Sequence, residues 1–279
     1  MTQLVTLNQS EERALAAMLG ASNDSSDNAL LPILKINLED EDDAGNSLKK
    51  GTFMLTGQED TVYGEKVTIR PLSQMFQWIN YDAEAQRAVN KTVIIPRLNM
   101  EARDEKGGVR CGKPASKVLK ENPDLAKKYK SITCFRYVHC LVSYSGKTAS
   151  GEDATVEKVP ALLRLKGANF SPFEDEVIKK LPKGAKLYEF NVEISATRKK
   201  NGSVIYYVLG FNPDLGNRLG LDQMTVDTLR HILNMVQEEN SRIDRKYQES
   251  ARNRSVDTAA LKAVEILEDE ESLAADLED

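Results

Sequence analysis

Basic side chains and aromatic rings occur together in two parts of this 279-residue chain. Residues 91–136 contain twelve Lys or Arg against five carboxylates, and Arg198-Lys199-Lys200 precedes an Asn-Gly pair. Cations can pair with phosphates, and rings can stack on the faces of unpaired bases. This combination is typical of proteins that bind single-stranded nucleic acid with little sequence preference.

We therefore expect these basic and aromatic side chains to line one channel. For each ring the alternative is burial in the core, and for each cation it is ordinary solvation. The joint density of the two residue types favours binding. The candidate ssDNA-binding residues are Arg70, Phe76, Trp78, Tyr81, Lys91, Arg97, Arg103, Arg110, Lys113, Lys117, Arg136, Tyr137, Arg198, Lys199 and Lys200.

Other motifs do not support an enzyme. Ser145-Gly146-Lys147-Thr148 resembles the end of a P-loop but lacks the earlier Gly and a following helix. A zinc site would need Cys111, Cys134, His139 and Cys140 to converge, yet Cys134 and His139 point to opposite faces of an extended strand. We expect buried structural thiols, no metal and no cofactor; a metal-dependent nuclease is the remaining enzymatic alternative.

Charge is unevenly distributed along the chain. Its net charge is −5, but residues 1–43 carry −7, residues 265–279 carry −8, and residues 44–264 carry +10. A cationic body suits a polyanion, and an anionic tail can compete for the same surface or recruit a basic partner. The candidate partner-binding residues of the tail are Glu268, Asp269, Glu270, Glu271, Leu273, Asp276, Leu277, Glu278 and Asp279.

Most of the body has the pattern of β-strands. Short β-branched runs bounded by Gly and Pro predict strands at 29–37, 51–57, 65–72, 92–100, 131–146 and 158–167. Residues 186–211 alternate apolar and polar positions around Asn201-Gly202, which predicts a hairpin with a type I′ turn. Short helices are expected at 10–19, 124–129, 172–181 and 256–268.

Residues 221–251 are expected to form a long helix. Val226, Leu229, Leu233, Val236, Asn240, Ile243 and Tyr247 follow a heptad spacing with one Asn at the seam. The helix can lie on the β-domain, or it can self-associate with the Asn fixing the register.

These elements predict a mainly β protein with accessory helices, whose core is an OB-like β-barrel. The expected segments are a flexible 1–28, an OB-like nucleic-acid-binding domain at 29–215, the long helix at 216–255 and an acidic tail at 256–279. No run of about 18 apolar residues occurs, so no membrane span is expected. The amino terminus has no secretory pattern, and three cysteines suit a reducing compartment, so we expect a cytoplasmic protein.

The layout resembles phage and bacterial single-stranded DNA-binding proteins, which pair an OB barrel with a disordered acidic carboxyl-terminal tail. The residues that carry the resemblance are LLPILKIN, GTFMLTG, VTIRPLSQMFQW, the Cys-containing basic segment, the YEF…YYV hairpin and the tail EILEDEESLAADLED. The tail ends in Leu-Glu-Asp rather than in an aromatic residue. The resemblance implies coating of ssDNA during replication or recombination, with the tail contacting replication or recombination proteins.

Two functions from different classes follow from these patterns. The first is ssDNA binding by a protein that is not an enzyme. The alternative is a virion structural or assembly protein that forms a homo-oligomer through the 221–251 helix.

Overall fold

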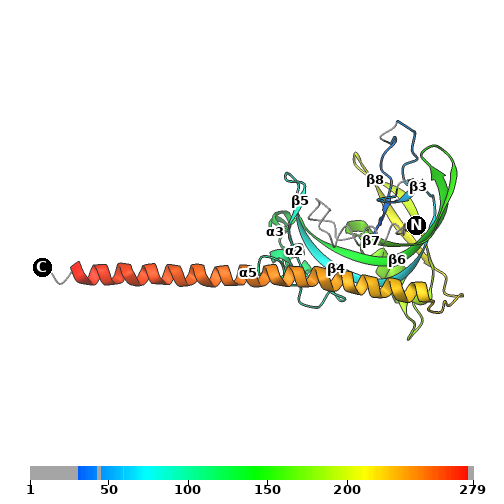
Figure 1. Ribbon diagram of the computed structural model, residues 1–279. Helices are drawn as coiled ribbons and strands as arrows, with labels where there is room; N and C mark the ends of the chain where they lie inside the picture. Colours follow the sequence, from blue (N-terminus) through cyan, green and yellow to red (C-terminus); the bar gives the residue numbers. More distant parts are fainter. Residues whose placement is uncertain (1–30, 43–44, 59, 276–279) are drawn as a thin grey trace, which may run out of the picture.

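The computed structural model describes residues 31–42, 45–58 and 60–275, with side chains described as far as Asn253. The chain is mainly β: nine strands form one sheet that curls into a half-barrel, and a long carboxyl-terminal helix lies beneath it (Figure 1). The strand order is β2-β1-β7-β6-β4-β8-β9, with β3 paired to β6 and β5 paired to β4. This confirms the expected mainly β class with accessory helices.

The strands and helices have the following bounds. The strands are β1 (Ile33–Ile36), β2 (Phe53–Leu55), β3 (Val62–Tyr63), β4 (Val67–Asp82), β5 (Arg87–Lys91), β6 (Ile132–Thr148), β7 (Asp153–Leu165), β8 (Val192–Asn201) and β9 (Val204–Pro213). The helices are α2 (Ser116–Glu121), α3 (Pro123–Lys128), α4 (Pro172–Glu176) and α5 (Gln223–Ala275). Short 3-10 turns occupy Arg110–Gly112, Gly167–Asn169, Ile178–Lys180 and Leu187–Glu189.

The central strands are buried on both faces. Along β6, Val138, Cys140 and Val142 belong to the main core inside the curl, whereas Tyr137 and Leu141 belong to a second cluster under α5. This is the period of two that a strand imposes on its side chains. Because both faces are covered, β6 reads as a nearly continuous apolar run rather than as a clean alternation.

The open edge of the sheet at β9 is covered by side chains from residues 167–176. Asn169 accepts a hydrogen bond from the Leu209 amide (2.8 Å) and donates one to the Tyr207 carbonyl (3.1 Å). Glu176 accepts one from the Phe211 amide (2.6 Å). These contacts satisfy the groups that an edge strand would otherwise leave unpaired.

Helix α5 lies along the convex side of the curl (Figure 1). Asp222 caps its start by accepting a hydrogen bond from the Thr225 amide at 2.7 Å. Ile232 then packs in the cluster of Leu72 and Leu141, and Ile243 belongs to the cluster that contains Val93 and Ala102. Of the two interpretations of this helix, the described contacts place it on its own sheet.

The heptad spacing misplaced part of the helix interface. Leu233, expected at the seam, is 51% exposed, and its neighbour Ile232 is buried instead. Asn240 does not face a second helix: its side-chain amide donates to the Ile94 carbonyl (2.9 Å) and accepts from the Ile94 amide (2.6 Å). The curved sheet offers a broader surface than a coiled-coil seam, so a strict heptad does not describe the contact.

Several expected elements differ in the structure. Residues 92–100 form isolated bridges to Phe76 and Asp104 instead of a strand, and β5 was not predicted. The start of the expected hairpin, Leu187–Glu189, is a 3-10 turn. Asn201 pairs with Val204, so the turn contains Gly202 and Ser203. Gly202 has φ 59° and Ser203 does not have a positive φ, which makes this a type II′ rather than a type I′ turn.

The two ends of the chain were expected to carry helices. Residues 10–19 lie outside the described residues. The separate helix expected at 256–268 is instead part of α5, which continues without interruption to Ala275 and extends far beyond the sheet (Figure 1). Along the described chain, no helix is both long and apolar enough to cross a membrane.

Replacing Arg70 tests how the sheet holds the start of α5. Arg70 is 9% exposed and donates hydrogen bonds to the Tyr188 and Gly220 carbonyls and to the Thr225 hydroxyl. Arg70→Met leaves these acceptors unpaired, so we expect the free energy of unfolding in urea to fall by about 3 kcal/mol. Arg230→Met, which removes only an exposed pair within α5, should change it by less than about 0.5 kcal/mol. Equal effects would show that Arg70 does not anchor the helix.

Replacing His139 tests a pH effect on stability. Burial lowers the pKa of His139 from 6.5 to about 4, and its Nδ1 lies 3.0 Å from the Ser73 hydroxyl. The unfolded chain therefore takes up a proton as the pH falls from about 6.5 to 4 while the folded chain does not, and the free energy of unfolding falls by at most about 3 kcal/mol. Urea unfolding of His139→Gln at pH 7.5 and 5 should show a smaller loss than the parent chain. His231→Gln, at an exposed position of α5, should keep the parent's loss.

Candidate nucleic-acid interface

Three of the predicted DNA-binding cations bind α5 or the segment leading into it. Arg70 lies 3.6 Å from Asp222 in addition to its hydrogen bonds near the helix start. Lys91 pairs with Glu239 at 2.7 Å, and Arg103 pairs with Asp244 at 3.2 Å. These groups hold the helix against the sheet, so none of the three is offered freely to a phosphate.

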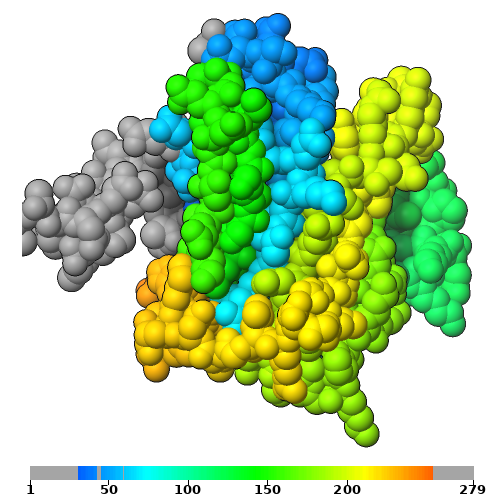
Figure 2. Space-filling view, turned by 90° about the vertical axis from the view of Figure 1, so that its right-hand side faces the viewer, coloured from blue at the N-terminus to red at the C-terminus, as the bar shows by residue number. Residues whose placement is uncertain are grey.

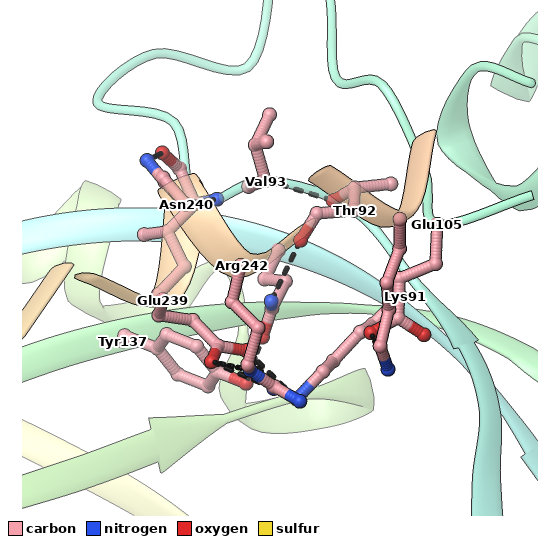
Figure 3. A network of polar contacts seen from close by, with 11 residues as sticks. Lys91, Thr92, Val93, Glu105, Tyr137, Glu239, Asn240 and Arg242 are labelled. Carbon is pink, nitrogen blue, oxygen red and sulfur yellow. Dashed lines mark hydrogen bonds and ion pairs between the residues drawn. The ribbon is translucent and has the colours of Figure 1, made fainter. Parts of the chain in front are cut away.

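Figure 3 shows the network around Lys91. Glu239 binds both Lys91 and Arg242, and Tyr137 lies beneath it. Burial raises the pKa of Glu239, but the hydrogen bonds from Lys91 and Arg242 outweigh that effect and hold it below its ordinary value. Because Glu239 stays ionised, its charge offsets the charges of Lys91 and Arg242, and these two cations contribute little to the positive potential of the surface.

Three of the four predicted rings are buried. Phe76 is 4%, Trp78 7% and Tyr137 7% exposed. The Tyr137 hydroxyl donates to Gln77 at 2.7 Å, and burial raises its pKa to about 12. Of the four, only Tyr81, at 49%, presents substantial surface, so the rings do not line a common channel as expected.

Three further predicted cations are partly or fully engaged inside the molecule. Arg110 lies over the Trp78 ring at 5.3 Å. Lys113 donates to the Ile132 carbonyl, and burial lowers its pKa. Arg136 is 2% exposed at the side chain and pairs with Glu174 at 2.8 Å. These three cations contact groups in or at the edge of the core, so they do not line an open channel.

The predicted cations that remain exposed lie in separate segments. Arg97 lies in the loop that follows Ile95, and Lys117 lies on α2. Arg198, Lys199 and Lys200 lie on β8, and within the described residues none of these five side chains forms an ion pair.

The β8–β9 hairpin gathers the densest set of free cations on an open surface. Strand β4 pairs with β8 only from Val192 to Ile194, so the rest of the hairpin extends past its neighbour as a two-stranded ribbon. Figure 2 shows it in yellow, standing clear at the upper right of the body. In the ribbon, Lys199 faces Tyr206 and Lys200 faces Ile205.

The exposed apolar residues of this ribbon were not predicted as a site. Val204 is 62%, Ile205 47% and Tyr206 37% exposed. None of them is among the candidate residues, because the strand alternation of residues 186–211 indicates a half-buried hairpin. The position of the turn was the available signal, since pairing back from Gly202-Ser203 places residues 205–207 directly opposite the basic run.

The cysteines and His139 do not assemble into one site. Cys140 contacts the Ala161 carbonyl in the inner core, and Cys111 contacts the Trp78 carbonyl. Burial raises the pKa of the Cys111 and Cys134 thiols to about 12. Among the described residues no group of three His, Cys, Asp or Glu side chains is placed to hold a metal ion.

Only part of the acidic tail lies within the described residues. Glu268, Asp269, Glu270, Glu271 and Leu273 lie on the helical backbone of α5, in contrast to the disordered tail that the resemblance implies. Asp276, Leu277, Glu278 and Asp279 lie outside the described residues. Near the point where α5 leaves the sheet domain, the Ser250 hydroxyl donates to the Glu105 carbonyl at 2.9 Å.

Comparison with known proteins does not identify the chain. No protein-family model matches it, and neither a curated protein nor a solved structure is significantly similar to it.

Proposed function

We propose that the protein binds single-stranded DNA through the β8–β9 ribbon and serves DNA replication or recombination. One observation carries the proposal: three cations with no ion pair among the described residues lie on a ribbon that extends from the sheet, opposite Ile205, Tyr206 and Tyr207, of which Ile205 and Tyr206 are exposed. Nothing in this role requires catalysis, so the protein is proposed as a binding protein and not as an enzyme.

The ribbon offers the two contacts that a single strand needs. Lys199 lies on the same face of the ribbon as Tyr206, and Arg198 and Lys200 lie on the other face. All three can neutralise phosphates, which gives a salt-dependent affinity without sequence preference. Tyr206 can stack on a base, worth about 1–3 kcal/mol, because an unpaired base exposes its face. A duplex hides those faces, so the aromatic contact favours the single strand.

The half-barrel supports the ribbon in this proposal, and an OB-like barrel is the finer architecture that we propose for it. A rigid curled sheet fixes the position of the ribbon and therefore the positions of its cations. The acidic helix end would then contact basic replication or recombination proteins. It would also weaken the binding of DNA to the body, because the acidic end and DNA carry charge of the same sign.

Neutralising the ribbon tests the site. We expect Arg198→Gln/Lys199→Gln/Lys200→Gln to weaken low-salt binding of fluorescent oligo-dT by about tenfold or more and to reduce the salt slope of log K by about 2, because up to three phosphate contacts are lost. Tyr206→Ala should weaken binding by about 1–3 kcal/mol with the salt slope unchanged. Fluorescence anisotropy across a salt series measures both.

The matched control is Lys120→Gln/Lys180→Gln/Lys183→Gln, which removes the same charge at three other exposed positions. It should retain most of the affinity. If both triple variants lose affinity equally, net charge alone drives binding and the ribbon is not the site.

Removing residues 265–279 tests the competition by the acidic end. These residues carry a net charge of −8, so their deletion should tighten oligo-dT binding at low salt and have little effect at high salt, where the charges are screened. A full-length variant with its Glu and Asp in this segment replaced by Gln and Asn should behave like the deletion. Unchanged affinity in both variants would contradict the competition while leaving the ribbon untouched.

A further inference from the structure

A pocket of about 470 Å³ opens beside α4, on the loop that follows Ile95 and the strands β4 and β6. Gln74, Phe76 and Arg136 come from neighbouring positions of β4 and β6, and Arg97 and Glu174 come from the loop and from α4. The volume lies in the range of small-ligand sites. Four segments separated in the sequence thus enclose one cationic hollow.

The guanidinium of Arg136 is held rigidly in the wall of this pocket. It lies 4.9 Å from the centre of the Phe170 ring, 5.1 Å from Phe76 and 5.8 Å from Phe173. The Arg136 Nη1 donates a hydrogen bond to the Gln74 side chain at 2.7 Å. The buried Nε of Arg136 has no hydrogen-bond partner in the described chain. A planar fork fixed between rings is prepared to bind an oxyanion with little loss of side-chain entropy.

The oxyanion present on Arg136 is the carboxylate of Glu174. Its oxygen lies 2.8 Å from Nη1, and the Glu174 side chain is 37% exposed. Arg136 is almost completely buried, whereas Glu174 reaches the surface and can turn toward water. The pair is therefore asymmetric: the cation is fixed, and its anionic partner can leave.

Two further cations border the same pocket. Arg97 is exposed and forms no ion pair within the described residues, and Lys179 pairs with Asp175 at 2.6 Å at the surface. A phosphate monoester carries close to two negative charges at neutral pH. Arg136 and Arg97 together match that charge, which a single carboxylate does not.

We propose that this pocket binds a phosphate monoester between Arg136 and Arg97, with Glu174 as the internal occupant that the ligand displaces. The phosphate can come from the 5′ end of a DNA strand or from a free nucleotide. The pocket is separate from the β8–β9 ribbon, so the proposal does not depend on the ribbon binding DNA.

The test compares ligands that differ by one phosphate. Calorimetry of the full chain with dTMP and with thymidine measures the free nucleotide, and anisotropy of 3′-labelled oligo-dT with a 5′-phosphate or a 5′-hydroxyl measures the strand end. Glu174→Gln removes the competing charge and keeps an oxygen for Arg136, so it should raise the affinity for the phosphorylated ligand about tenfold. Arg97→Gln should lower it by a similar factor.

Control variants change the same charges elsewhere. Glu157→Gln and Lys183→Gln, at exposed positions, should leave the ratio of phosphorylated to unphosphorylated affinity as it is in the parent chain. A preference confined to the oligonucleotide identifies the strand end, and binding confined to dTMP identifies a free nucleotide.

The proposal is overturned if Glu174→Gln binds dTMP no better than thymidine and the phosphorylated oligonucleotide no better than its 5′-hydroxyl form. Because dTMP binding is measured without any strand, a failure of the ribbon to bind oligo-dT leaves this result readable. Conversely, if the protein binds the 5′-hydroxyl oligonucleotide normally but shows no preference for phosphorylated ligands, the pocket proposal is refuted and the ribbon proposal is not.

Discussion

The contact between α5 and the convex face of the sheet governs how the polar residues of the body are used. The helix must bury its apolar stripe, and the face beneath it carries groups that cannot be buried unpaired. Asn240 satisfies both backbone groups of Ile94, Glu239 binds Lys91, and Arg70 binds carbonyls near the helix start. The helix is thus bound by polar complementarity as well as by apolar area, and that complementarity consumes cations which the sequence offers to a ligand.

Coverage of the central strands explains why the rings are not a platform. α5 covers one face of β4 and β6, and the curl of the sheet with α4 covers the other, so Phe76 and Tyr137 are buried on different sides of the same strands. Exposed apolar surface remains where this cover ends. Among the described residues, the β8–β9 hairpin beyond Ile194 has no neighbouring strand, which leaves Tyr206 open to solvent next to cations that form no ion pair there.

The body contains two kinds of cation with different physical roles. Arg136 is desolvated and therefore needs an anion or an acceptor at all times, which Glu174 and Gln74 provide. Lys199 and Lys200 are solvated and need no partner to be stable. The counter-ion of a buried cation such as Arg136 is part of the fold unless a ligand replaces it. Solvated cations such as Lys199 and Lys200 contribute positive electrostatic potential and are available to a polyanion.

The sequence by itself determined the β-rich class, the long helix and the hairpin, because each depends on local periodicity or on a turn signal such as Asn201-Gly202. It also determined the concentration of positive charge between two acidic ends. Only the tertiary structure decided which cations are free, since Lys91 and Glu239 are far apart in sequence and meet only when α5 docks. Burial of Trp78 likewise depends on which faces of the curved sheet are covered, a choice that local spacing does not encode.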